Sequence, residues 1–180
     1  MQQILFDGFE IQTAEQIQEA WTATAAEVTD LFARCSPAEF SADRDGRWSF
    51  AQNLNHLTRS AGAVAKGLGF PKLLIRVLFG RGGQSRALMQ LQADYKQKLA
   101  GGAQARGRFV PKAANSSQDE AIQAWRNTVL LLQKNLGKWN DKQLDNSRMP
   151  HPLLGKLTVR EMLFFTIFHT QHHLAQCRST

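Results

Sequence analysis

The sequence has few cysteines and prolines and no long uninterrupted apolar run. Cys35 and Cys177 are its only cysteines, too few for a disulfide framework. Five prolines and no window of regular strand alternation predict an all-helical chain. The longest apolar stretch, residues 68–79, contains two basic residues and is too short to span a bilayer. These absences exclude a disulfide scaffold and a transmembrane protein.

The length and composition are those of a single globular domain. The chain has 180 residues, of which 43% are hydrophobic and 21% charged, so it can bury a substantial core. The segment Met1–Asp7 has neither a basic leader nor a cleavage site of small residues, so no secretory signal is visible. We therefore expect one domain over residues 1–180, located in the cytoplasm and without membrane contact.

Four segments carry the signature of a helix start. In each, a serine or threonine is followed three residues later by glutamate or glutamine, a pair that satisfies the free amides of a first helical turn. Apolar residues then recur every three or four positions, which is the seam of a helical bundle. The sequence thus predicts an all-α four-helix bundle whose helices begin after Thr13, Ser49, Ser117 and Thr158.

The second and third of these helices are far apart in the sequence. About 45 residues separate them, too many for a simple turn. Residues 86–99 read as an extra helix between two glycine pairs, and the rest as a long crossover or lid. Before the last helix, residues 150–155 cannot be helical, because Pro150 and Pro152 restrict the backbone.

The net charge is +7, and many of the basic residues lie between Lys66 and Lys112. This balance suits an anionic substrate or a nucleic acid. No nucleic-acid motif accompanies it, and the region has few aromatic residues for base stacking. A solvated basic surface explains the charge better, so we do not expect a nucleic-acid partner.

Histidines are the most informative residues. The chain has five, and three fall within residues 169–173. His169 and His173 are four apart, so both imidazoles lie on one face of a helix and can reach one metal ion. His56 lies on another predicted helix. Three histidines with an open coordination position are typical of a catalytic metal site rather than a structural one.

The surroundings of these histidines leave two questions open. On the second helix small residues flank His56, which indicates either free volume beside it or a tight helix crossing. On the last helix His169 and His173 share an apolar face, where an unpaired imidazole is costly. A second apolar stripe there needs cover from another chain segment or from a second subunit in a homodimer. That stripe consists of Phe164, Ile167, Gln171 and Leu174.

Three motifs resemble those of the DinB-like family. Trp48-Ser49 precedes His56, and residues 169–176 read His-Thr-Gln-His-His-Leu-Ala-Gln. Residues 151–158 read His-Pro-Leu-Leu-Gly-Lys-Leu-Thr. The resemblance covers residues 13–178. It implies a four-helix bundle with a three-histidine site for zinc, nickel, manganese or iron, and an activity as a thiol-dependent transferase or a hydrolase.

The resemblance also assigns roles to residues. It makes His56, His169 and His173 the metal ligands and His172 the neighbouring histidine that does not bind the metal. His172 could then act as a catalytic acid or base, or simply face another helix.

The chemistry of such a site has two forms. Three neutral imidazoles leave the charge of a dication intact, so a bound water could reach a pKa of about 7 and support hydrolysis. The open position could instead bind the thiolate of a low-molecular-weight thiol cofactor, which predicts thiol transfer to a small-molecule substrate. Arg76 and Arg81 in the crossover are candidates for binding an acidic cofactor. The rival hypothesis is a non-enzymatic, metal-stabilised bundle that binds an anionic partner such as nucleic acid.

Overall fold

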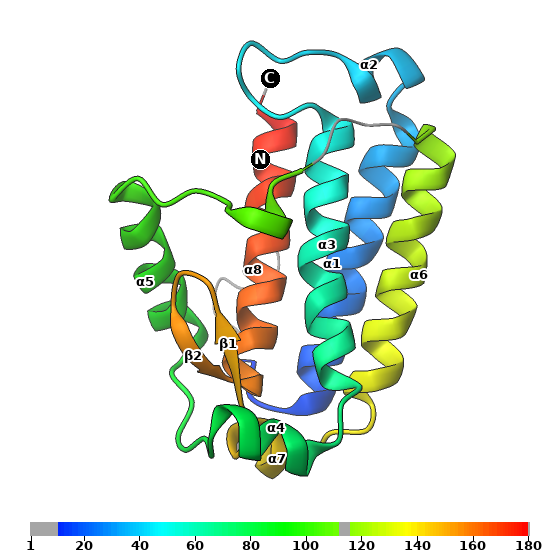
Figure 1. The fold of residues 1–180 in the computed structure, drawn as a ribbon. Helices are drawn as coiled ribbons and strands as arrows, with labels where there is room; N and C mark the ends of the chain where they lie inside the picture. Colours follow the sequence, from blue (N-terminus) through cyan, green and yellow to red (C-terminus); the bar gives the residue numbers. More distant parts are fainter. Residues whose placement is uncertain (1–10, 112–115, 180) are drawn as a thin grey trace.

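The computed structural model describes residues 11–111 and 116–179. Residues 1–7, for which no secretory signal is expected, and Lys112 lie outside the described residues. Four long helices form the bundle shown in Figure 1. They are α1 (Ala14–Arg34), α3 (Phe50–Leu68), α6 (Gln118–Leu136) and α8 (Val159–Arg178). The predicted all-α four-helix bundle with a long crossover between its second and third helices is confirmed.

Each bundle helix begins where its capping signature predicts. The side chain of Thr13 accepts a hydrogen bond from the backbone of Gln16, and the Gln16 side chain bonds back to the cap. Ser49, Ser117 and Thr158 form the same reciprocal pair with the residue three positions on. Local sequence therefore sets the start of all four helices.

The apolar seams meet in one core. Trp21 of α1 and Trp125 of α6 are almost fully buried and pack edge to face, with ring centroids 5.7 Å apart. Helix α8 is buried on nearly every side. Its second apolar stripe faces α1, where Gln171 donates a hydrogen bond to Thr24 at 3.4 Å. The chain's own first helix covers the stripe that suggested a second subunit.

The crossover contains more helix than predicted. It forms α4 (Lys72–Phe79), α5 (Leu88–Ala100) and the short 3-10 helix η1 (Gly107–Phe109). Helix α5 starts two residues later than expected, because Arg86 is held in an extended segment by α8. Its backbone amide and its Nε both donate to Glu161 Oε1, at 2.9 and 2.8 Å. Helix α4 was not predicted.

A β-hairpin, β1 (Arg148–His151) and β2 (Gly155–Thr158), leads into α8. Residues 150–155 are non-helical as predicted, but the strands were missed because four residues are too few to display alternation. Two short helices, α2 (Pro37–Ser41) and α7 (Asp141–Asp145), were also not predicted. Figure 1 shows the hairpin and α5 together on one side of α8. In the part of the chain described, no helix is long and apolar enough to cross a membrane.

Candidate metal centre

The structure brings together the three histidines that the sequence singles out. His56 comes from α3, and His169 and His173 from successive turns of α8. All three are buried, and one nitrogen of each lies within 4.8 Å of the others. The Nε2 atoms of His56 and His169 are 3.1 Å apart. Two imidazole nitrogens on one tetrahedral zinc ion, at its usual bond length, lie about 3.3 Å apart, so the spacing fits a shared metal.

The protonation state of the cluster also suits ligation. Burial lowers the pKa of His173 to about 3 and the pKa of His169 well below its ordinary value. Burial lowers the pKa of His56 as well, although a hydrogen bond to a backbone carbonyl opposes the shift. All three imidazoles are therefore neutral at pH 7, which is the form that binds a metal.

Two of the rings are oriented through their second nitrogen. Nδ1 of His173 donates to Oδ1 of Asn53 at 2.9 Å, and the Asn53 amide donates in turn to the carbonyls of Trp48 and Ser49. Nδ1 of His56 donates to the carbonyl of Phe109 in the crossover at 2.6 Å. Because Nδ1 carries the proton in both rings, their Nε2 lone pairs are available to a metal.

Aromatic side chains hold the rings in place. Trp48 stacks on His173 with an interplanar angle of 3° and centroids 5.7 Å apart. Phe165, one turn before His169 on α8, stacks on His169 at 5.0 Å. The orientation of these candidate ligands is thus set without an ion, which would reduce the free-energy cost of metal binding.

Asn53 provides a direct test of this arrangement. We expect Asn53→Ala to weaken binding of a divalent metal about 10- to 100-fold, because His173 loses the acceptor that fixes its tautomer. Ser60→Ala, on the same helix and also at the cavity wall, is the matched control and should leave the affinity unchanged. Competition titration with a chromophoric chelator measures both. Equal affinities for the two variants would contradict the orienting role.

The cluster opens into a cavity of about 1130 Å³ between α3, α8, the hairpin and the crossover. Ser60, Ala63 and Gly67 on α3 line it. The small side chains of Ser60 and Ala63 leave volume open, as in the first of the two interpretations of this stripe. Gly67 instead allows a close approach of the hairpin, because a Cβ there would lie 2.5 Å from Met149 Cε. The cavity wall holds five cationic side chains and, among the residues described, no carboxylate. The cations are Arg44, Arg47, Lys66, Arg106 and Arg108.

The other predicted site residues lie in two places. His172 lines the cavity, its ring centroid 5.5 Å from that of His173, and its Nε2 accepts a hydrogen bond from the Gln176 amide. Burial lowers the pKa of His172, and the nearby Lys96 lowers it further. Arg76 and Arg81 are elsewhere. Both contact Ser147, through the Arg76 side chain and the Arg81 backbone, and neither lines the cavity.

Three cavity residues were not predicted as site residues. Asn53 is one of them, although its position three residues before His56 puts it on the same helix face. His151 was noted only within a motif, and Tyr95 of α5 not at all. Tyr95 packs against Phe165 and lies 6.1 Å from His169 between ring centroids. No local pattern could locate Tyr95, because its position depends on how the crossover docks.

Comparisons with known proteins agree with this architecture. A family model described as the DinB superfamily matches residues 16–177. The crystal structure of TT2238, a four-helix bundle protein, is similar at 18% identity and a TM-score of 0.60, covering 93% of this chain and all of that one. A DinB-like protein from Bacillus cereus is similar at 16% identity and a TM-score of 0.58, covering 92% and 89% of the two chains. A search of curated proteins returned no significant match.

Proposed function

This chain belongs to the DinB superfamily, and from that premise we propose that it is a metal-dependent enzyme acting on a small molecule, as a transferase or a hydrolase. The observation that carries the proposal is the buried group of three neutral imidazoles beside a large cavity. The proposed ligands are His56, His169 and His173. The proposed ion is zinc, nickel, manganese or iron, since imidazole suits several of these metals.

The protein's own residues divide the work. Asn53 and the Phe109 carbonyl hold two ligands in the correct tautomer, and Trp48 and Phe165 keep the rings in position. His172 is the proposed acid–base group, because it lies at the cavity wall next to His173 but is not part of the three-histidine cluster. A divalent ion held by three neutral ligands supplies Lewis-acid chemistry and lowers the pKa of a bound water or thiol.

The charge of the cavity supports an anionic group on the substrate or the thiol cofactor. Several cations without a neighbouring carboxylate create a positive potential that concentrates anions. Arg44 and Arg47 already bind backbone carbonyls at the end of α8, so part of their charge serves the fold. Lys66 of α3 and Arg106 and Arg108 of the crossover are the proposed contacts for the anion, in place of Arg76 and Arg81.

The proposal is tested by assaying the metal-loaded protein for both reactions. Mercaptosuccinate with 1-chloro-2,4-dinitrobenzene tests thiol transfer, and p-nitrophenyl acetate tests hydrolysis. We expect one activity in the wild type and its loss in His56→Ala, with the folded state checked by circular dichroism. Binding of a labelled DNA duplex across salt concentrations tests the rival hypothesis. If neither activity is found, and DNA binding depends on salt and is unchanged by His56→Ala, the protein is a non-enzymatic binding bundle rather than an enzyme.

A further inference from the structure

His151, at the end of β1, has an unusual hydrogen-bonding state for a buried histidine. The residue is 9% exposed, and its Nδ1 accepts hydrogen bonds from the backbone amides of Leu153 and Leu154, at 3.2 and 3.0 Å. A ring nitrogen that accepts two amides carries no proton, so the neutral ring must hold its proton on Nε2. Burial keeps the ring neutral by lowering the pKa of His151 to about 4. The turn of the hairpin therefore fixes His151 as a donor at Nε2.

The Nε2–H group lies open to the cavity. His151 is part of the cavity wall, and within residues 11–111 and 116–179 its Nε2 has no hydrogen-bond partner. Trp21 Nε1 is the one fully enclosed side-chain polar atom without a partner in that range, so Nε2 of His151 is accessible from the cavity. A polar group at such a position in a native protein normally meets water or a ligand.

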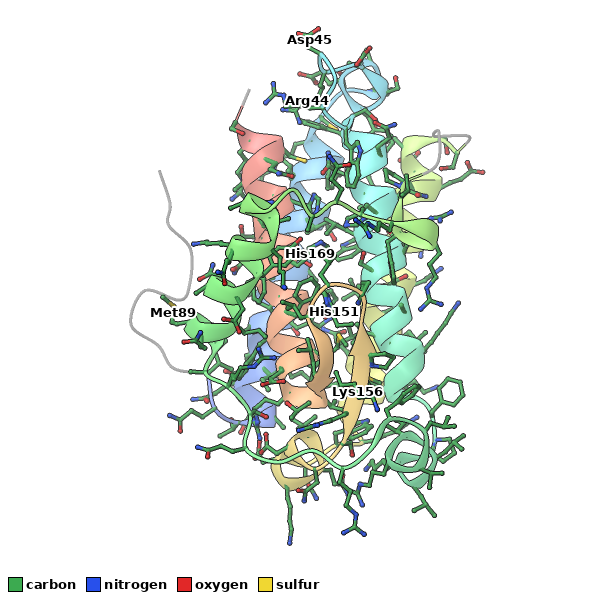
Figure 2. All side chains as sticks on the ribbon, turned by 60° about the vertical axis from the view of Figure 1, so that its left-hand side comes forward. Arg44, Asp45, Met89, His151, Lys156 and His169 are labelled. Carbon is green, nitrogen blue, oxygen red and sulfur yellow. The ribbon has the colours of Figure 1, made fainter. Side chains whose placement is uncertain are left out.

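This donor is next to the candidate metal centre. The His151 ring packs against Phe165 with centroids 4.1 Å apart, and the same phenylalanine stacks on His169 at 5.0 Å. Figure 2 shows His151 on the hairpin close to His169 on α8. One aromatic ring thus separates the donor from the proposed ligands, and His151, Phe165 and His169 all line the same cavity.

We infer that His151 recognises a carbonyl or carboxylate oxygen of the cavity's substrate through its Nε2–H, as a neutral hydrogen-bond donor. The inference rests on the proposed function, because it takes the cavity as the substrate site. A substrate without an acceptor at this point leaves a buried N–H unpaired, so His151 selects for molecules that carry one. A donor that stays neutral can also polarise a carbonyl without transferring its proton.

Two substitutions separate this role from the structural role of the ring. His151→Asn places an acceptor near the Nδ1 position, where an asparagine side chain readily bonds the amide two residues on. It has no atom at the Nε2 position. His151→Gln does the reverse: its amide N–H reaches the Nε2 position, and the acceptor for Leu153 and Leu154 is lost. The His151→Asn variant should preserve the turn and lose the hydrogen bond to the ligand. The His151→Gln variant should keep that hydrogen bond and weaken the turn.

The binding test uses metal-free protein and two uncharged probes of the same shape. Cyclohexanone offers a carbonyl acceptor, and methylenecyclohexane is its hydrocarbon isostere. We expect His151→Asn to weaken cyclohexanone binding about fivefold, the factor for one neutral hydrogen bond, and to leave methylenecyclohexane binding unchanged. His151→Gln should retain more of the cyclohexanone affinity than His151→Asn while lowering the melting temperature further. Equal loss of both probes in both variants would overturn the inference and leave His151 a structural residue.

A measurement on the wild type makes the test independent of variant folding. In a ¹⁵N-labelled sample the His151 ring should show the Nε2–H tautomer at pH 7, and cyclohexanone should shift its Nε2 resonance. A ring protonated on Nδ1, or an Nε2 signal insensitive to cyclohexanone, would reject the donor role. Metal affinity is measured separately on the same samples. If the protein binds no metal but cyclohexanone still shifts the Nε2 resonance, the proposed function fails while the inference for His151 stands. The two results are therefore distinguishable.

Discussion

Removal of the metal by a chelator is expected to lower the melting temperature of the metal-loaded protein by about 8–16 °C. A ligand that binds only the folded chain, present at a thousand times its dissociation constant, stabilises the fold by about 4 kcal/mol. For a chain of this size each kcal/mol corresponds to about 2–4 °C. The three proposed ligands come from two helices, and His56 and His169 are 113 positions apart in the sequence, so the unfolded chain cannot reproduce the site. Differential scanning calorimetry before and after chelation measures the shift.

A second histidine on α8, His172, gives this prediction a matched control. His169→Ala removes a proposed ligand, so its melting temperature should no longer respond to the chelator. His172→Ala removes the neighbouring imidazole that contacts Gln176 instead, and it should keep the full response. If the activity proposed above depends on His172, this second variant is inactive but still binds metal. A chelator response that survives in His169→Ala would place the metal elsewhere in the chain.

Acid should destabilise the metal-free protein at a pH where most proteins are still stable. The folded state holds His173 and His151 neutral, with pKa values lowered to about 3 and about 4, whereas both titrate near pH 6.5 in the unfolded chain. As the pH falls below about 6.5 the unfolded state binds more protons, so the free energy of unfolding decreases. Each histidine contributes about 1.4 kcal/mol per pH unit, and the loss continues until the pH reaches the folded-state pKa.

The loss of stability between about pH 6.5 and pH 5 can be assigned to histidines rather than to carboxylates. Asp145 and Glu161 are paired with arginines, and their lowered pKa values make a contribution that is lost only as the pH falls below about 4. Urea unfolding at pH 7, 6 and 5 therefore measures the histidine term alone. His151→Asn should reduce the slope by about 1.4 kcal/mol per pH unit. A free energy of unfolding that does not change between pH 6.5 and 5 would refute the buried neutral state.

What could be predicted from the sequence was local. The capping residues at Thr13 and Ser49 define helix starts because the relevant hydrogen bonds span three residues. The alignment of His169 with His173 follows from the helical repeat alone. Grouping His56 with these two histidines requires knowing which helices pack together. Periodicity does not give that information, and the resemblance to known motifs did.

What could not be predicted depends on the folding of the crossover. Arg76 and Arg106 are equally basic in sequence, but only docking decides that Arg106 faces the cavity while Arg76 binds Ser147. The acceptor of His56 is a backbone carbonyl of Phe109, and any residue type could supply it. His151 gains its fixed tautomer from two backbone amides of a turn, which leave no signature in the sequence.

The hydrogen bond between His56 and the Phe109 carbonyl couples the crossover to the candidate metal centre. Phe109 lies in η1, which contacts α3 at the cavity, so its carbonyl can orient His56 only while this part of the crossover is docked. Such coupling is reciprocal: a metal that favours the oriented ring favours the docked crossover by the same free energy. A molecule that displaces η1 on entering the cavity must then weaken metal binding, whereas one that holds η1 in place strengthens it. Metal affinity measured with and without a ligand thus reports whether the crossover opens or closes over that ligand.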